Sequence, residues 1–114
     1  MKTIQYGSER VIADNGGQMI LKYYITETPV GFGYSDLKSY GVGILRTDKN
    51  PGLPDMKECK QIEGVFFDIE EAIIFMSKIK KAAILPENLT KVLGKYIEEK
   101  VKVQKEKRRK ECIG

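Results

Sequence analysis

The chain has 114 residues, of which 41% are hydrophobic and 32% charged, and its formal net charge is +4. These values are typical of one globular domain and argue against a wholly disordered chain. The sequence contains no histidine, which excludes Ser-His-Asp and Cys-His catalysis and any zinc site with a histidine ligand.

The sequence has no apolar run close to the roughly 20 residues that span a bilayer. Its start has no apolar segment of signal-peptide length. We therefore expect a cytoplasmic protein without a membrane partner, in which Cys59 and Cys112 are free thiols. We interpret Cys59 as a small strand residue, with a reactive thiol as the alternative.

Apolar residues alternate along the first part of the chain, as expected for strands, whose successive side chains point to opposite faces. This pattern predicts strands over residues 8–14, 18–28, 38–47 and 57–65. Asn15, Gly16 and Gly17 suit a tight hairpin turn between the first two strands. The last strand has few apolar residues, and its lysines suit an exposed edge.

The second and third predicted strands should each have one core face. In the second strand Met19, Leu21, Tyr23 and Ile25 should point inward, whereas Gln18, Ile20, Lys22, Tyr24, Thr26 and Thr28 should point outward. In the third strand Tyr40, Val42 and Ile44 should point inward, which leaves Gly41 and Gly43 on the outward face. We interpret these glycines as a site of close packing or a bulge; a ligand groove is the alternative.

After Phe67 the apolar residues recur at helical spacing and predict a helix over residues 68–83. Asp68 is placed to cap its first turn, with Glu71 at the capping-box position. The predicted buried stripe has Phe75 at its margin and Ile74 well off it; it consists of Ile69, Ala72, Ile73, Met76, Ile79 and Ala83. Ile74 is a candidate protein contact, although one exposed apolar side chain is common.

A second helix is predicted over residues 86–103, with Pro86 in its first turn. Its apolar stripe consists of Leu89, Val92, Leu93, Tyr96 and Ile97. Lys100 falls near the centre of this stripe, so firm packing should stop between Ile97 and Val103. Residues 104–114 have no apolar face and are expected to be a frayed or disordered tail.

Together these elements predict an α+β fold, in which an antiparallel sheet of three to four strands is followed by two helices packed on one face. One domain should span residues 1–103, followed by the tail. Residues 91–114 hold nine Lys or Arg and four Glu, so the basic excess of the chain lies at its C-terminus.

The tail is the one stretch of the chain whose composition favours a ligand. Its cations could neutralise phosphates in a salt-sensitive, sequence-independent contact with nucleic acid; they are Lys105, Lys107, Arg108, Arg109 and Lys110. We favour a solvated tail, because no aromatic residue is interleaved for base stacking. A membrane-surface contact would lack an adjacent apolar helix face.

Three segments of the chain form a recognisable set: Tyr23-Tyr24-Ile25-Thr26-Glu27, Tyr40-Gly41-Val42-Gly43-Ile44, and a late helix opening with Pro86 and Leu89. In this order they resemble a family of small uncharacterised proteins from spore-forming anaerobic bacteria. The resemblance covers roughly residues 21–101; the chain departs from it at Leu85, where a small polar capping residue is expected, and in its longer basic tail. It implies a compact intracellular domain with no assigned activity, cofactor or functional residues.

No catalytic constellation, metal-ligand set or cofactor motif is evident in the sequence. We therefore expect a small non-enzymatic protein that acts through protein–protein contacts, with an unknown partner or by self-association. An accessory nucleic-acid-binding protein that uses the tail is the alternative, and an enzyme without histidine is the third hypothesis. We expect no cofactor.

Overall fold

Four strands followed by two helices make up the fold. The computed structural model describes residues 2–30 and 37–113, and for residues 103–113 it describes the backbone alone. Its elements are β1 (Lys2–Ile12), β2 (Gln18–Pro29), β3 (Lys38–Lys49), β4 (Met56–Phe66), α1 (Ile69–Lys81), a 3₁₀ turn (Pro86–Asn88) and α2 (Leu89–Ile113). The predicted α+β fold is confirmed.

The strands form one antiparallel sheet in the order β1-β2-β3-β4, so each strand pairs with its neighbour in the chain. The β1–β2 and β3–β4 connections each contain a glycine at positive φ, which glycine adopts readily: Gly16 has a φ of 82° and Gly52 a φ of 77°. In the β1–β2 connection the Gly17 N–H donates to Asn15 Oδ1 over 2.9 Å. The predicted hairpin at this place and the edge position of β4 are confirmed.

β1 begins at Lys2, whereas the sequence pattern predicted a start at Ser8. Residues 2–5 pair with β2, and a bulge between Gln5 and Gly7 shifts the register. An extra residue of this kind shifts the alternation of side chains between the two faces by one position. The bulge therefore hides the first half of β1 from a search for strict alternation.

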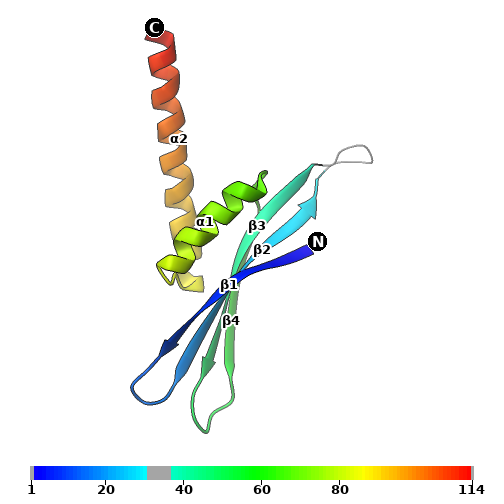
Figure 1. The fold of residues 1–114 in the computed structure, drawn as a ribbon, viewed down its shortest axis with the longest axis vertical. Coiled ribbons are helices and arrows are strands. Elements are labelled where there is room, and N and C mark those ends of the chain that lie inside the picture. Colours follow the sequence, from blue (N-terminus) through cyan, green and yellow to red (C-terminus); the bar gives the residue numbers. More distant parts are fainter. Residues whose placement is uncertain (1, 31–36, 114) are drawn as a thin grey trace.

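The hydrophobic core lies between the helices and the face of the sheet that they cover (Figure 1). Its buried side chains are Leu21, Tyr23, Ile25, Val42, Ile44 and Phe66 from the sheet, and Ala72, Phe75, Met76, Ile79, Leu89, Leu93 and Tyr96 from the helices. Most side chains predicted to point inward are buried; Met19 and Tyr40 are partly buried against the core.

α1 begins as predicted, because Asp68 Oδ1 accepts a hydrogen bond from the Glu70 N–H over 3.0 Å. Glu71 was expected to complete a capping box, but its carboxylate pairs with Lys100 of α2 instead. That contact ties the first turn of α1 to α2. The hydrogen bond to Glu71 raises the pKa of Lys100.

The buried face of α1 is rotated from the predicted stripe. Phe75, expected at the margin, is 1% exposed, whereas Ile73, expected in the stripe, is 41% exposed. The cause is an aromatic cluster: the Phe75 ring centroid lies 5.8 Å from that of Phe66 on β4 and 5.1 Å from that of Tyr96 on α2. Turning Phe75 into this cluster moves Ile73 to the opposite flank of the helix.

α2 packs on the core through Leu89, Leu93 and Tyr96, and its contact with α1 reaches Lys100. Ile97, predicted in the buried stripe of this helix, is 43% exposed, because the buried face is formed by Leu89, Leu93 and Tyr96. Beyond Lys100 the helix extends away from the sheet (Figure 1), and its backbone is helical to Ile113. The side chains of the predicted basic tail lie outside the described part.

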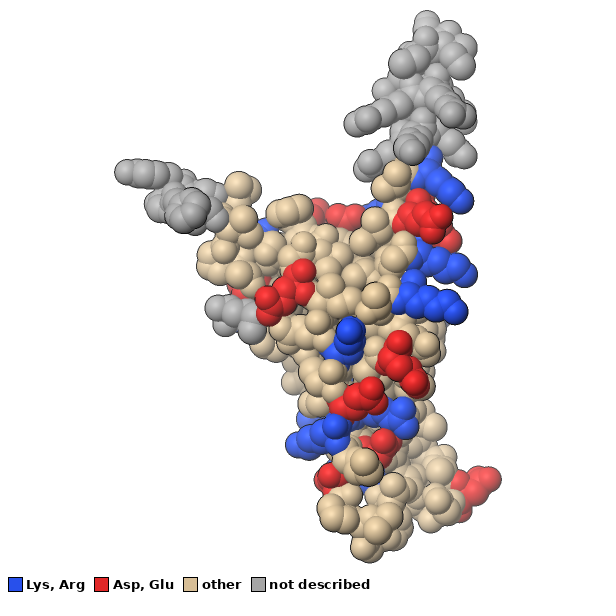
Figure 2. Space-filling view, turned by 180° about the vertical axis from the view of Figure 1, so that it is seen from behind, with Lys and Arg blue, Asp and Glu red and all other residues tan. Residues whose placement is uncertain are grey.

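The opposite face of the sheet has no helix over it among the described residues (Figure 1). We call it the open face. Antiparallel sheets commonly leave one face to solvent. Figure 2 shows the molecule from behind, where charged side chains gather along α2 and the area beside it is largely uncharged.

Candidate functional site

Two neighbouring isoleucines, Ile73 and Ile74, form what we call the α1 outer surface. Ile74, the candidate contact from the sequence, is 51% exposed, and Ile73 is 41% exposed. Ile73 and Lys80 are seven residues apart and therefore lie on the same flank of α1. Lys80 reaches Glu9 of β1, with 2.8 Å between Nζ and Oε1. The Ile73 flank thus adjoins the β1 edge of the sheet.

The two edge strands differ in how they are protected. β4 has charged side chains at four positions, Lys57, Glu58, Lys60 and Glu63. Charged side chains discourage pairing between edge strands. β1 carries Thr3, Ile4, Gln5, Tyr6, Gly7 and Ser8 without a charge among them. The β1 edge is therefore the better template for an added strand.

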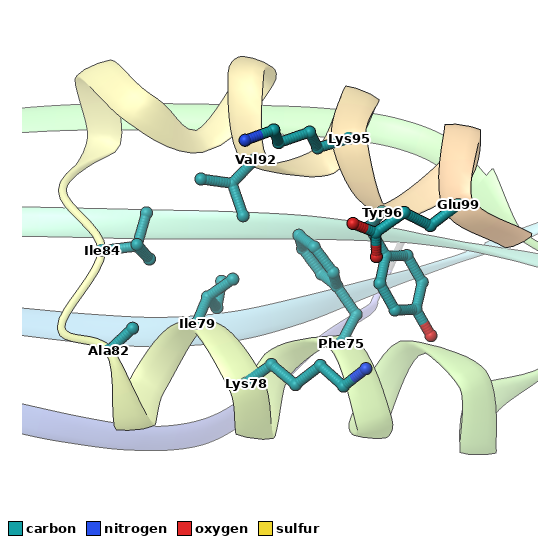
Figure 3. A pocket seen from close by; sticks show the side chains of 9 residues that line it. All are labelled: Phe75, Lys78, Ile79, Ala82, Ile84, Val92, Lys95, Tyr96 and Glu99. Carbon is teal, nitrogen blue, oxygen red and sulfur yellow. The ribbon is translucent and has the colours of Figure 1, made fainter.

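A cavity of about 220 Å³ lies between the helices (Figure 3). α1 crosses the covered face of the sheet and contacts all four strands, and α2 lies beside it (Figure 3). Phe75, Ile79, Ala82, Ile84, Val92 and Tyr96 give the cavity apolar walls, and Lys78, Lys95 and Glu99 complete its lining. The Lys78 Nζ lies 5.1 Å from the Tyr96 ring centroid, a cation–π distance.

Tyr23 closes the core beneath this cavity. Its side chain is fully buried, and its hydroxyl donates to the Ile84 carbonyl over 3.0 Å. Burial raises the pKa of Tyr23 to about 12, with a further contribution from the negative charge of Glu9. The phenol is therefore a neutral structural donor that fixes the segment between α1 and α2.

The glycines of β3 are sites of close packing, as the favoured interpretation held. A Cβ at Gly43 would lie 2.2 Å from Tyr24 Cζ, so the phenol end of Tyr24 lies directly over this glycine. A Cβ at Gly41 would lie 2.5 Å from the Ile62 carbonyl oxygen of β4. The tyrosine thus occupies the strip that the ligand-groove alternative would have left open.

Tyr24 extends across β3 to reach β4. Its hydroxyl lies 3.0 Å from Cys59 Sγ and donates to Gln61 Oε1 over 3.0 Å. Burial and the hydrogen bond with Cys59 raise the pKa of Tyr24. Cys59 is an exposed free thiol on β4. Its contact with the Tyr24 hydroxyl makes it part of this cross-strand interaction.

The Tyr24 ring also borders a cavity on the open face, which we call the open-face cavity. Its volume is about 330 Å³. It is lined by Thr3 and Gln5 of β1, Lys22 and Tyr24 of β2, Leu45 of β3, and Cys59 and Gln61 of β4. The cavity therefore has apolar walls, several neutral hydrogen-bonding groups and one cation.

Thr26 departs from the outward exposure expected of it. It lies on the open face, opposite Gly41, yet its side chain is fully buried. Its Oγ1 has no hydrogen-bond partner among the described residues, and a buried hydroxyl in that state lowers stability. The close approach of β4 over Gly41 accounts for the burial of this hydroxyl.

Comparison with known families gives one result for the chain. Residues 2–99 match the family of unknown function DUF6514. The chain belongs to that family. The match agrees with the resemblance to uncharacterised proteins, and it brings no activity. No curated protein and no solved structure matches the chain.

The family match ends at residue 99, before the basic tail. The side chains of Lys105, Lys107, Arg108, Arg109 and Lys110 lie outside the described part, as does that of Cys112. Among the described residues no helix is both long and apolar enough to cross a membrane. Within the same part of the chain, no three acidic or cysteine side chains come together as a metal site.

The sequence correctly placed Ile74 off the buried stripe of α1, where it is exposed, but it did not predict the open-face cavity. The cavity combines side chains from all four strands, which come together only through the strand register. The pair Tyr24 and Gly43 is the sequence signal that could have indicated the cavity. A large outward side chain can lie across an outward glycine of the neighbouring strand.

Proposed function

We propose that this chain is a non-enzymatic protein that acts in the cytoplasm through protein–protein contacts. The contact is formed by the α1 outer surface and the adjoining β1 edge, and the partner is a second copy of the chain. The observation that carries this proposal is the exposure of Ile73 and Ile74 side by side on α1, 41% and 51%. The absence of histidine from the sequence supports the non-enzymatic role.

The β1 edge supports a symmetric contact. Two copies of β1 can pair antiparallel about a twofold axis, which would extend the sheet across both copies. Lys2 near one end of β1 would then approach Glu9 near the other end of the partner strand. Opposite charges at the two ends of a self-pairing strand favour this register.

The family match is consistent with a conserved structural unit but gives no partner. From the resemblance of the Tyr23–Glu27 and Tyr40–Ile44 segments, we further propose that the members of this family come from spore-forming anaerobic bacteria. The tail takes no part in the contact proposed here.

The test is the mass of the full chain in solution, measured by light scattering across a range of concentrations. We expect a dimer that Ile73→Lys and Ile74→Lys weaken, because each places a charge in the contact. Ile97→Lys on α2 is the matched control, since Ile97 is 43% exposed and lies away from this surface. Its dimer should match that of the unchanged protein.

A chain that is monomeric at every concentration contradicts a second copy as the partner. Equal weakening by the Ile73 and Ile97 variants contradicts the α1 outer surface. The melting temperature of each variant shows whether a loss of association follows from unfolding, and an exposed substitution should leave it nearly unchanged.

A further inference from the structure

Three cations on the open face make no ion pair with the part of the chain that the structure describes. The strand register places Arg10 of β1, Lys22 of β2 and Lys57 of β4 on this face, because cross-strand partners point to the same side of a sheet. All three are exposed. None of them makes an ion pair with a described residue.

Several strand charges on the covered side of the sheet form ion pairs. Glu9 pairs with Lys80, and Arg46 pairs with Asp48. Glu27 pairs with Lys38 on the same side.

Lys2 and Lys60 on the covered side also make no ion pair with a described residue, and Lys49 on the open face pairs with Asp55. What distinguishes the three cations of the open face is that they share it with the Tyr24 ring and the open-face cavity.

The open-face cavity adds an aromatic ring to these cations. The phenol end of Tyr24 rests on Gly43, its hydroxyl is held by Cys59 and Gln61, and the same side chain lines the cavity. A ring held in this way is preorganised to receive a flat ligand. Leu45 adds an apolar wall, and Gln5 and Lys22 add polar groups.

We propose that the open face binds single-stranded nucleic acid, with one base stacked against Tyr24 and phosphates on Lys22, Arg10 and Lys57. Aromatic side chains next to a cationic surface are the means by which proteins bind single strands without sequence preference. A base fits a cavity of about 330 Å³ with apolar walls and neutral hydrogen-bonding groups. The charge of the surface complements a phosphate backbone.

Neighbouring strands lie about 4.8 Å apart, so the cations spread over a width of three strand spacings, which is the scale of a few nucleotides. Glu63 is the opposing charge on this face, and its carboxylate accepts a hydrogen bond from the Gln61 amide over 2.9 Å. It would repel a phosphate near Gln61. The site therefore predicts weak, salt-sensitive binding.

This inference is independent of the proposed protein contact, because the open face and the α1 outer surface lie on different sides of the sheet. It also differs from the hypothesis that the tail binds nucleic acid. Ile73→Lys should leave the binding unchanged. The two ideas can therefore fail separately.

The experiment measures the fluorescence anisotropy of labelled oligo-dT and oligo-U with the full chain as salt is varied. The same measurements are made on a full-length variant with glutamine at Lys105, Lys107, Arg108, Arg109 and Lys110. In that second background we expect residual binding. Tyr24→Leu should weaken it about tenfold or more, whereas Tyr24→Phe, which keeps the ring, should bind nearly as well as Tyr24.

The cations are tested by Lys22→Gln, with Lys95→Gln on α2 as the matched control of equal charge change. Lys22→Gln should reduce the slope of log affinity against log salt by about 0.7; Lys95→Gln should not change it. Glu63→Gln should strengthen binding. Circular dichroism shows whether each variant is folded.

Several outcomes would overturn the inference. The first is no binding by the tail-substituted chain while the unchanged chain binds, which would assign all binding to the tail. The second is equal binding by Tyr24→Leu and Tyr24→Phe when both are folded. The third is competition by free UMP as strong, per molecule, as by oligo-U, which would assign the cavity to a mononucleotide.

Discussion

The two faces of the sheet use charged and aromatic side chains in opposite ways. On the covered side, several carboxylates and cations of the strands pair with one another or with the helices, as Glu9 does with Lys80. The aromatic rings of this side pack together, with 5.1 Å between the centroids of Phe75 and Tyr96. The aromatic cluster and several ion pairs of the fold therefore lie on the covered side, although Glu58 and Lys60 of β4 make no ion pair with a described residue.

On the open face the partners are missing or indirect. Lys22 makes no ion pair with a described residue, and Tyr24 lies on the backbone of Gly43 rather than on another ring. A face built only for solubility would not need an ordered ring beside a cavity. The comparison teaches that stability is concentrated on one side of the sheet, and it leaves the other side free for a ligand.

The largest expected effect comes from removing an aromatic ring on the covered face. Phe75→Ala should lower the free energy of unfolding by about 3–5 kcal/mol, because it opens a cavity in a cluster that joins β4, α1 and α2. Denaturant unfolding of the full chain measures this change. Ile74→Ala on the same helix is the control and should stay within about 0.5 kcal/mol; a similar loss in both would contradict the assigned core.

The glycines of β3 test how tightly the open face is built. Gly41→Ala should destabilise the protein by about 1–3 kcal/mol, because its Cβ would meet backbone atoms, the Ile62 carbonyl oxygen at 2.5 Å and Glu63 Cα at 2.8 Å. Gly43→Ala should cost less, since the atoms in its way belong to the Tyr24 side chain, which can turn into solvent.

Displacing Tyr24 has a second consequence that separates the two glycines. Gly43→Ala should weaken binding of oligo-dT by the tail-substituted chain, even where its stability is nearly unchanged. Thermal melting and anisotropy together measure both effects. A Gly43 variant that is more damaged than the Gly41 variant would mean that Tyr24 is fixed more rigidly than its contacts indicate.

The sequence predicted the elements whose patterns are local. The alternation around Tyr23 and Val42 predicted β2 and β3, and Asp68 predicted the start of α1. These succeed because strand periodicity and capping depend on residues close together in the chain. Ile74 was also placed correctly as exposed.

The failures of the sequence analysis share a cause in contacts between distant residues. The rotation of α1 depends on Phe66 and Tyr96, which lie outside the helix and hold Phe75 in place. The start of β1 depends on pairing across a bulge near Gly7. No local pattern carries either of these, because each is a property of two elements once they are packed.

The cationic site on the open face also depends on contacts between residues that are distant in the sequence. Arg10, Lys22 and Lys57 come from three strands, and in the sequence they are ordinary polar residues of alternating segments. Only the register shows that all three point to one face and that no described carboxylate pairs with them. The sequence therefore directed attention to the tail, where the cations are consecutive.

The smallest expected changes in stability come from two lysines, one on each face of the sheet, and they compare the two faces directly. Lys80→Gln should destabilise the protein by up to about 1 kcal/mol, since it removes the ion pair with Glu9 on the covered side and both partners are partly exposed. Lys22→Gln should leave stability within about 0.5 kcal/mol, because it removes no ion pair with a described residue. Denaturant unfolding of both variants gives the two values under the same conditions.

The binding measurement should reverse this order. Lys22→Gln should lower the salt dependence of nucleic-acid binding while Lys80→Gln leaves it unchanged, since Lys80 is already neutralised by Glu9. If the two faces are used differently, Lys22 should contribute to binding but not to stability. Lys80 should contribute to stability but not to binding. If Lys22→Gln instead destabilises the protein as much as Lys80→Gln, the Lys22 charge has a partner within the fold. That result would contradict the proposal that the open face binds an external ligand.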